Sequence, residues 1–171
     1  IDRSDGLLLM FERPLDGLGF GLDYMKATAA LGQRFCIRLQ ARAGLHVGEV
    51  LAWRNSREAV RMGAKPLELE GLAKPMAARL AALALPGQLL VSAVAEPLTR
   101  HAAGELGERG ELLLWKSHGR WCFKGVPGNQ EIHEVGEAGA GAVAVARGPV
   151  RPAWRPRAVS LVGCRRNVDD G

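Results

Sequence analysis

The stretch that most constrains the fold of this chain is residues 71–92. Its apolar residues recur at three- and four-residue steps, which predicts a helix with one buried stripe. Alanines fill the positions between them, so another backbone can approach this helix closely. A Pro-Gly pair then predicts a turn, and residues 88–92 predict a buried strand. The stripe consists of Leu72, Met76, Leu80 and Leu83.

The rest of the chain predicts further strands and helices around this unit. The apolar run at residues 7–11 predicts a central strand, and residues 14–31 predict a helix that Gly32 ends. Alternating apolar and polar residues at 37–47 predict a half-buried strand. The order predicts one sheet with helices on one face, in an α+β sandwich. Further strands are expected at residues 50–53, 112–115, 120–123 and 131–135, a helix at 93–101, and a loop or short helix at 54–66.

The positive charge of the chain is concentrated near its C-terminal end. Residues 147–171 hold six arginines and two aspartates, a net charge of +4 out of the total of +5. The body therefore lacks the basic face that a nucleic-acid binder needs, and we expect no nucleic-acid partner. Residues 137–171 are rich in Ala and Gly, then in Pro and Arg, which predicts a disordered linker or tail after a folded domain at residues 1–136.

The cysteines and the apolar runs indicate the compartment. Three cysteines lie far apart with no metal-binding spacing, which favours a reducing, cytoplasmic environment. No run of 18 apolar residues occurs, so we expect no membrane span within the sequence. Because the first residue is Ile1 and no signal peptide follows, we expect a fragment of a longer protein. The basic tail leaves open a position close to a membrane.

Three polar residues each allow a structural and a functional interpretation. Asp5 precedes a predicted strand and is either a turn residue or a metal ligand at the end of the sheet. Arg79 lies beside the apolar stripe of its helix, either as a surface residue or as a functional one. For His46 the pattern favours a hydrogen-bonded structural role over catalysis, because no Cys, Ser or second His accompanies it at a useful spacing.

Four segments, taken in order, resemble the catalytic domain of class III adenylate/guanylate cyclases of the bacterial type. No single motif is decisive, but the ordered set covers most of residues 4–136. The resemblance implies a ferredoxin-like βαββαβ sandwich that lacks its first strand here, and a homodimer with composite active sites. The segments are SDGLLLMF (4–11), RAGLHVGEVLAW (42–53), EGLAKPMAARLAALALPGQLLVS (70–92) and WCFKGVPGNQEIHEVG (121–136).

The resemblance also implies an activity and a set of site residues. The family converts a nucleoside triphosphate, here ATP, to the 3′,5′-cyclic nucleotide and pyrophosphate with two divalent metal ions, Mg²⁺ or Mn²⁺. Asp5 matches the second metal-binding aspartate, and Arg79 matches the arginine that stabilises the α-phosphate in the transition state. Lys124 matches the lysine that contacts the terminal phosphates, and Glu68 matches the acidic residue that reads the base.

The sequence departs from the family pattern at several positions. The first metal-binding aspartate belongs to a strand upstream of residue 1. Pro75 stands where the family has its catalytic asparagine and fits better as a first-turn helix residue. The base-reading lysine falls at Ile1, so Arg3 is the nearest cation, and Ser4 replaces a glycine. ATP is favoured over GTP by Glu68 and by the absence of a guanine-type cysteine.

Two other hypotheses stay open beside an adenylate cyclase. The chain could be a degenerate cyclase-homology domain that binds nucleotide or dimerises without turnover, as Pro75 suggests. Alternatively, it could be a non-cyclase module whose residues 147–171 dock on anionic lipid or nucleic acid, with binding that salt weakens.

Overall fold

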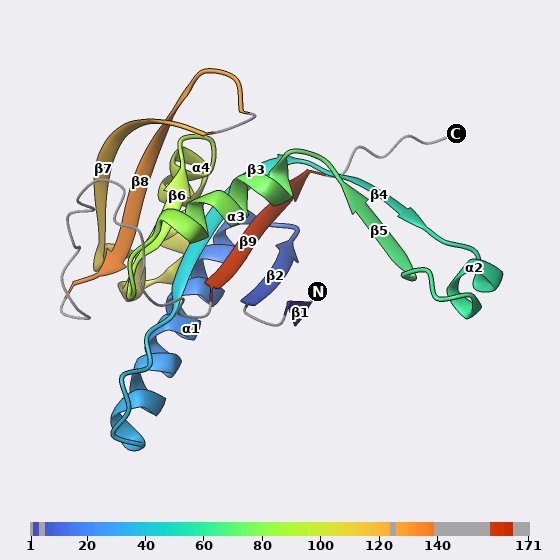
Figure 1. Ribbon diagram of the computed structural model, residues 1–171. Helices are drawn as coiled ribbons and strands as arrows, with labels where there is room; N and C mark the ends of the chain where they lie inside the picture. The colour runs from blue at the N-terminus through green and yellow to red at the C-terminus, as the bar shows by residue number, and fades with distance from the viewer. Residues whose placement is uncertain (1, 4–5, 124–125, 139–157, 166–171) are drawn as a thin grey trace.

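The protein is an α+β structure built on a mixed seven-stranded sheet (Figure 1). This computed structural model describes residues 2–3, 6–123, 126–138 and 158–165. The strand order is β1-β2-β9-β3-β6-β8-β7, in which neighbours from β2 to β6 are parallel and the others antiparallel. The strands of this sheet are β1 (Asp2–Arg3), β2 (Gly6–Phe11), β3 (Arg42–Glu49), β6 (Leu89–Ser92), β7 (Leu113–Cys122), β8 (Asn129–Glu137) and β9 (Ala158–Arg165).

Helices cover both faces of the sheet, which corrects the expectation that they lie on one face. Figure 1 shows α3 in front of the sheet and α1 behind it. One apolar cluster joins α1 and α4 to one face of β3, and a second joins α3 to the other side of β6 and β8. The helices are α1 (Pro14–Arg34), α2 (Arg57–Arg61), α3 (Ala73–Leu83), α4 (Ala95–Ala102) and α5 (Glu108–Glu111), with a 3-10 helix at Ala103–Leu106.

The predicted helix–turn–strand unit folds as expected and packs tightly on β3. A Cβ atom added at Gly44 of β3 would lie 2.4 Å from the amide nitrogen of Ala81 and 2.6 Å from the carbonyl oxygen of Ala77. The backbones of β3 and α3 are therefore almost in contact, as the small residues of the helix allow. Leu80 of the predicted stripe is fully buried, whereas Leu72 precedes the helix and is 65% exposed.

Strand β3 is buried on both sides, which corrects the expectation of a half-buried strand. It begins at Arg42, and even this arginine is largely buried, with its Nη1 donating to the carbonyl of Ala82 at 3.1 Å. The alternation of polar residues misled the prediction because α1 and α3 cover opposite faces. Residues 37–41 are not part of the strand. Helix α1 passes Gly32 and ends at Arg34.

An antiparallel arm protrudes from the sheet beside α3. It consists of β4 (Leu51–Arg54) and β5 (Leu67–Glu70), which form a separate two-stranded sheet with α2 at its far end (Figure 1). The Ser56 side chain caps α2 by accepting a hydrogen bond from the amide of Ala59 at 3.1 Å. The expectation of a loop or short helix at residues 54–66 is confirmed.

Residues 158–165 form strand β9, in contrast to the predicted linker over 137–171. Strand β9 lies between β2 and β3 and pairs in parallel with both, from Ala158 to Gly163 against β2 and from Ala158 to Arg165 against β3. The short run AVSLVG is apolar enough for a buried strand, but its Pro- and Arg-rich surroundings concealed it. Most of the remaining tail lies outside the described residues. Strand β8 continues to Glu137, one residue past the predicted domain end.

Strand β7 replaces two separately predicted strands. Residues 112–115 and 120–123 were expected to be separate, but β7 runs through both with an irregularity between Ser117 and Arg120. Gly119, at a φ of +75°, provides the local bend. None of the helices within the described residues is both long and apolar enough to cross a membrane.

Candidate functional site

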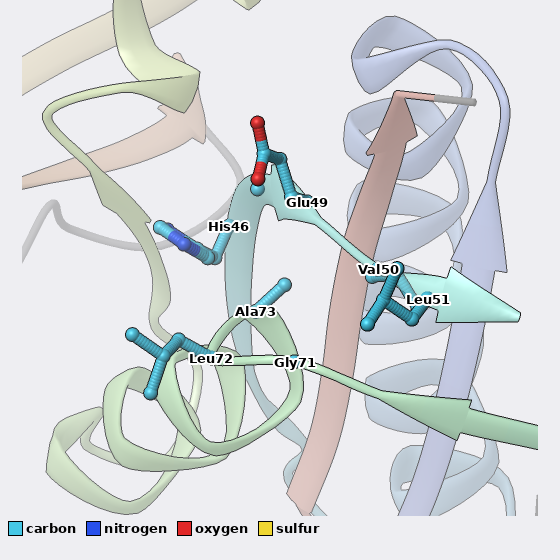
Figure 2. Close-up of a pocket in the computed structure, with 8 residues that line it drawn as sticks. His46, Glu49, Val50, Leu51, Gly71, Leu72 and Ala73 are labelled. Carbon is cyan, nitrogen blue, oxygen red and sulfur yellow. The ribbon is translucent and has the colours of Figure 1, made fainter. Parts of the chain in front are cut away.

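A pocket of about 400 Å³ opens where the arm leaves the sheet and returns to it. Three segments line it: the end of β3, the first residues of the outgoing arm strand, and the turn that leads from the arm into α3 (Figure 2). Two of the lining side chains can form polar contacts with a ligand, and the others are apolar or glycine. The lining residues are His46, Gly48, Glu49, Val50, Leu51, Gly71, Leu72 and Ala73.

Glycine at position 71 allows the arm to return close to its starting point. Gly71 has a φ of +129°, and a Cβ there would lie 2.6 Å from the carbonyl oxygen of Glu49. Any other residue would both strain the backbone and clash with β3. Gly71 therefore fixes the base of the arm against β3, and with it the wall of the pocket.

His46 is a neutral hydrogen-bonded residue at the inner side of this pocket. Its Nδ1 lies 2.8 Å from Oγ of Ser92, and that Oγ also accepts a hydrogen bond from the amide of Ala95 at 3.3 Å. Burial lowers the pKa of His46 to about 4, so the imidazole is uncharged at neutral pH. The preferred structural interpretation of His46 agrees with this geometry.

Ser92 is the partner that sequence reasoning missed. His46 and Ser92 are 46 positions apart, but β3 and β6 are parallel neighbours with Leu45 opposite Val91. The next residues along the two strands, His46 and Ser92, therefore lie side by side. Only the parallel pairing of the strands could have revealed this contact, since no local motif links the two residues.

Two of the five candidate site residues can be placed with their side chains. Glu68 lies on β5 opposite Trp53 of β4, and its Oε1 lies 3.4 Å from Nδ2 of Asn55. Arg79 lies on α3, is half-buried, and already takes part in an interaction within the chain. The structure thus places Glu68 on the arm and Arg79 on the helix, before and after the pocket-lining turn at residues 71–73 in the chain, and neither residue lines the pocket.

The other three candidates fall wholly or partly outside the described residues. Asp5 and Lys124 lie outside them, and Arg3 is described only as a backbone position on β1, paired with Gly6 of β2. Pro75 lies in the first turn of α3, as predicted, where its missing N–H removes no intrahelical hydrogen bond.

The described residues do not build a metal site. Among them no group of three or more His, Cys, Asp or Glu side chains could hold an ion. The expected ligand Asp5 lies outside this set. We therefore derive no chemical step through a metal ion from this structure.

A buried polar network lies away from the pocket, and no sequence pattern indicated it. The Glu134 carboxylate on β8 lies 2.7 Å from Nε2 of His118 and accepts a hydrogen bond from Nε2 of Gln88 at 3.1 Å. The side chains of His118 and Glu134 are only 5% and 4% exposed. Because water and substrate cannot reach them, these groups tie β6, β7 and β8 together rather than forming a binding site.

The fold and the pocket define an α+β domain with a partly polar pocket at the base of a protruding arm. No protein-family model matches this chain, and no curated protein matches it. Its function is therefore proposed from the residues and their arrangement.

Proposed function

We propose that this chain is most of a nucleotidyl cyclase catalytic domain that converts ATP to 3′,5′-cyclic AMP and pyrophosphate. The observation that carries the proposal is the continuity between the arm and α3. The segments at 42–53 and 70–92, which resemble class III cyclases, form the outgoing arm strand, the return and α3. Glu68 lies on β5 between these two segments and Arg79 lies on α3, so the two residues belong to elements that join at the pocket-lining turn, although neither lines the pocket.

The side chains fit the roles that the resemblance assigns to them. The Glu68 carboxylate only accepts hydrogen bonds when ionised, so it can accept one from the amino group of adenine. The Arg79 guanidinium stabilises negative charge on the α-phosphate as the P–O bond to pyrophosphate breaks. Lys124 and Arg3 supply further positive charge for the nucleotide, and Asp5 one carboxylate for divalent cations.

The metal ions are part of the proposal by resemblance alone. Bound Mg²⁺ or Mn²⁺ would lower the pKa of the ribose 3′-hydroxyl and balance charge on the triphosphate. Asp5 and an aspartate upstream of residue 1 would hold these ions.

We further propose that the active form is a cytoplasmic homodimer with composite sites. Leu51 and Trp53 lie on one face of the arm and remain 69% and 42% exposed. Glu68 shares that face, because it lies directly opposite Trp53. A second copy that covers these residues would bury apolar area and enclose Glu68.

The test is cyclisation of ATP and of GTP with Mn²⁺, with products identified by mass. The protein should be extended upstream to include the missing strand. We expect cyclic AMP from the parent and none from Asp5→Ala. Arg79→Ala should lower kcat more than it raises KM, by about 10²–10³-fold, as for loss of a group that stabilises transition-state charge.

A matched control tests whether the loss of any arginine, and not of Arg79 in particular, lowers activity. Arg57→Ala removes an exposed arginine from α2 at the far end of the arm and should leave kcat within about twofold. Normal turnover by Arg79→Ala, or equal losses in both variants, would contradict the role assigned to Arg79.

The second candidate function is nucleotide binding without turnover, and Pro75 favours it. A proline cannot supply the amide side chain that the family uses at this position, and the structure holds it in the first turn of α3. On this hypothesis the extended dimer binds ATP by calorimetry but gives no cyclic product with either metal.

A further inference from the structure

The C-terminal half of α1 projects from the body of the protein (Figure 1). The first half of the helix packs on the sheet through Leu15, Leu18 and Leu22. Beyond these residues, Gly32 is the one buried residue of the helix. A helix of 21 residues is about 30 Å long, so roughly half of that length extends past the core. We call residues 26–40, which include the end of this helix and the returning chain, the α1 tip.

The way in which α1 ends leaves apolar side chains without cover. The amide of Ile37 donates to the carbonyl of Gly32 at 2.9 Å, the amide of Cys36 donates to Gln33 at 3.2 Å, and Cys36 has a φ of +51°. In this type of helix end, the residue at the position of Ile37 frequently packs on the residue at the position of Gly32 or of Leu31. Gly32 has no side chain for this contact, and Ile37 is 56% exposed.

Two more large apolar residues are exposed on the same tip. Phe35 is 62% exposed and Leu31 is 46% exposed. A Cβ at Gly32 would lie 2.9 Å from the carbonyl oxygen of Ile37, so glycine is what allows the chain to return this closely. The tip is therefore an ordered structure with apolar residues at its surface.

All charged residues of the α1 tip are positively charged. Between Asp23 and Glu49 the sequence contains no acidic residue. Lys26, Arg34 and Arg38 are all exposed on the tip, and the Arg34 guanidinium lies 5.7 Å from the centre of the Phe35 ring. The nearest carboxylate in sequence, Asp23, pairs with Arg109 at 2.9 Å on the side of the body.

We propose that the α1 tip docks this protein on an anionic phospholipid surface. Phe35, Ile37 and Leu31 enter the headgroup region, while the three cations contact lipid phosphates. A protein partner fits less well, since a stable interface buries about 800 Å² on each side and a helix end is only about 10–12 Å wide. Fluid lipid, by contrast, can close around a projecting tip.

This docking does not depend on the proposed cyclase activity. The arm leaves the body in a different direction from the α1 tip (Figure 1), so dimer formation through the arm leaves the tip free. Docking through the α1 tip also differs from docking through the basic tail at residues 147–171. The experiment must distinguish these two modes of membrane binding.

The first test is co-sedimentation of the whole chain with phosphatidylcholine vesicles, with and without one third phosphatidylserine. We expect binding only to the anionic vesicles, weakened by salt. The double variant R34E/R38E should bind at least about 30-fold more weakly, given about a fivefold loss for each positive charge removed. The control R57E/R61E makes the same change in charge on α2 and should bind within about threefold of the parent.

The second test uses the native cysteines to report where the lipid lies. Cys36 on the tip and Cys122 at the end of β7 are both exposed. A polarity-sensitive dye on Cys36, with Cys122→Ser and Cys164→Ala, should shift to the blue on anionic vesicles. The same dye on Cys122, with Cys36→Ser and Cys164→Ala, should not shift.

Three results would overturn the proposal. One is binding with no change in the Cys36 dye. Another is binding that R151E/R155E in the tail abolishes and R34E/R38E leaves intact. The third is a lack of binding to anionic vesicles together with self-association that the tip variants remove. Phe35→Ser serves as a second variant if R34E/R38E fails to fold, and it should weaken binding about tenfold with the charge unchanged.

Discussion

At the scale of single residues, a few positions decide how closely the elements of this protein can pack. Gly44 allows α3 to lie almost against β3, and Gly71 brings the arm back against the end of the same strand. His46 lies between these two contact points along β3 and is hydrogen-bonded to Ser92. Each of these residues has a role that depends on a neighbour from another element.

Replacing Gly44 with alanine should destabilise the protein. The new Cβ would approach backbone atoms of Ala77 and Ala81 that cannot move without shifting the helix, so we expect a loss of about 1–3 kcal/mol or more in the free energy of unfolding. Gly19→Ala is a matched control, because nothing lies within 4 Å of its added Cβ and it lies within α1. That control should gain about 0.5–1 kcal/mol. Urea denaturation of both variants measures this, and equal effects would contradict the tight contact.

The partly buried imidazole of His46 should make stability depend on pH. Its pKa is about 4 in the folded protein and about 6.5 in the unfolded chain. The contribution is fully present above about pH 6.5. It declines as pH falls toward 4, because only the unfolded chain takes up the proton in that range.

We expect this contribution to be about 1–2 kcal/mol, allowing for the partial exposure of His46. His46→Gln should lack that part of the pH dependence, while the titrations of all other groups remain common to both proteins. Parallel stability curves for parent and variant between pH 6.5 and 4 would show that the imidazole does not resist protonation.

At the scale of elements, the position of β9 matters most. It lies between β2 and β3 and pairs with both along six and eight residues respectively. Removing it would leave two facing strand edges with unpaired backbone groups in the middle of the sheet. At the other end of the sheet, the side chains of His118, Glu134 and Gln88 connect β7, β8 and the residue that precedes β6.

Truncation tests the role of β9 directly. A chain that ends at residue 157 loses the strand, and we expect its Tm to fall by more than 10 °C or cooperative unfolding to disappear. A chain that ends at residue 165 keeps β9 and should retain the Tm of the parent within about 2 °C. Equal melting temperatures for the two chains would restore the interpretation of residues 158–165 as a tail.

At the scale of the whole molecule, two projections extend from one sheet. The arm and the α1 tip point in different directions (Figure 1). Both carry exposed apolar residues, but the charged residues around them differ. On the arm these residues share a face with carboxylates, since Leu51 lies opposite Glu70 and Trp53 lies opposite Glu68. On the tip they lie among cations alone. We therefore assign the arm to a second copy and the tip to lipid.

The proposed dimer predicts a large effect at Trp53. A buried aromatic residue at the centre of an interface commonly contributes 2 kcal/mol or more, so Trp53→Ala should raise the dimer Kd by about 30-fold. Leu114→Ala removes an apolar side chain that is 50% exposed on β7, the edge strand at the far end of the sheet from β3 and the arm, and should leave the Kd within about twofold. Sedimentation equilibrium measures both, and a monomeric parent would remove the dimer from the proposal.

The sequence by itself determined most of the local structure. Apolar spacing and turn residues located α1, the unit of α3 and β6, and α4, because these signals act over a few neighbouring residues. The same signals failed where a strand is buried by elements that are distant in the sequence. The polar residues of β3 suggested an exposed face until α1 and α3 were seen to cover both sides.

Only the tertiary structure decided which distant residues meet. The pairing of His46 with Ser92, of His118 with Glu134, and of β9 with both β2 and β3 depends on strand order, which no local pattern contains. The arm and the α1 tip became visible as surfaces for the same reason. Whether an apolar residue is buried depends on what the remainder of the chain places against it.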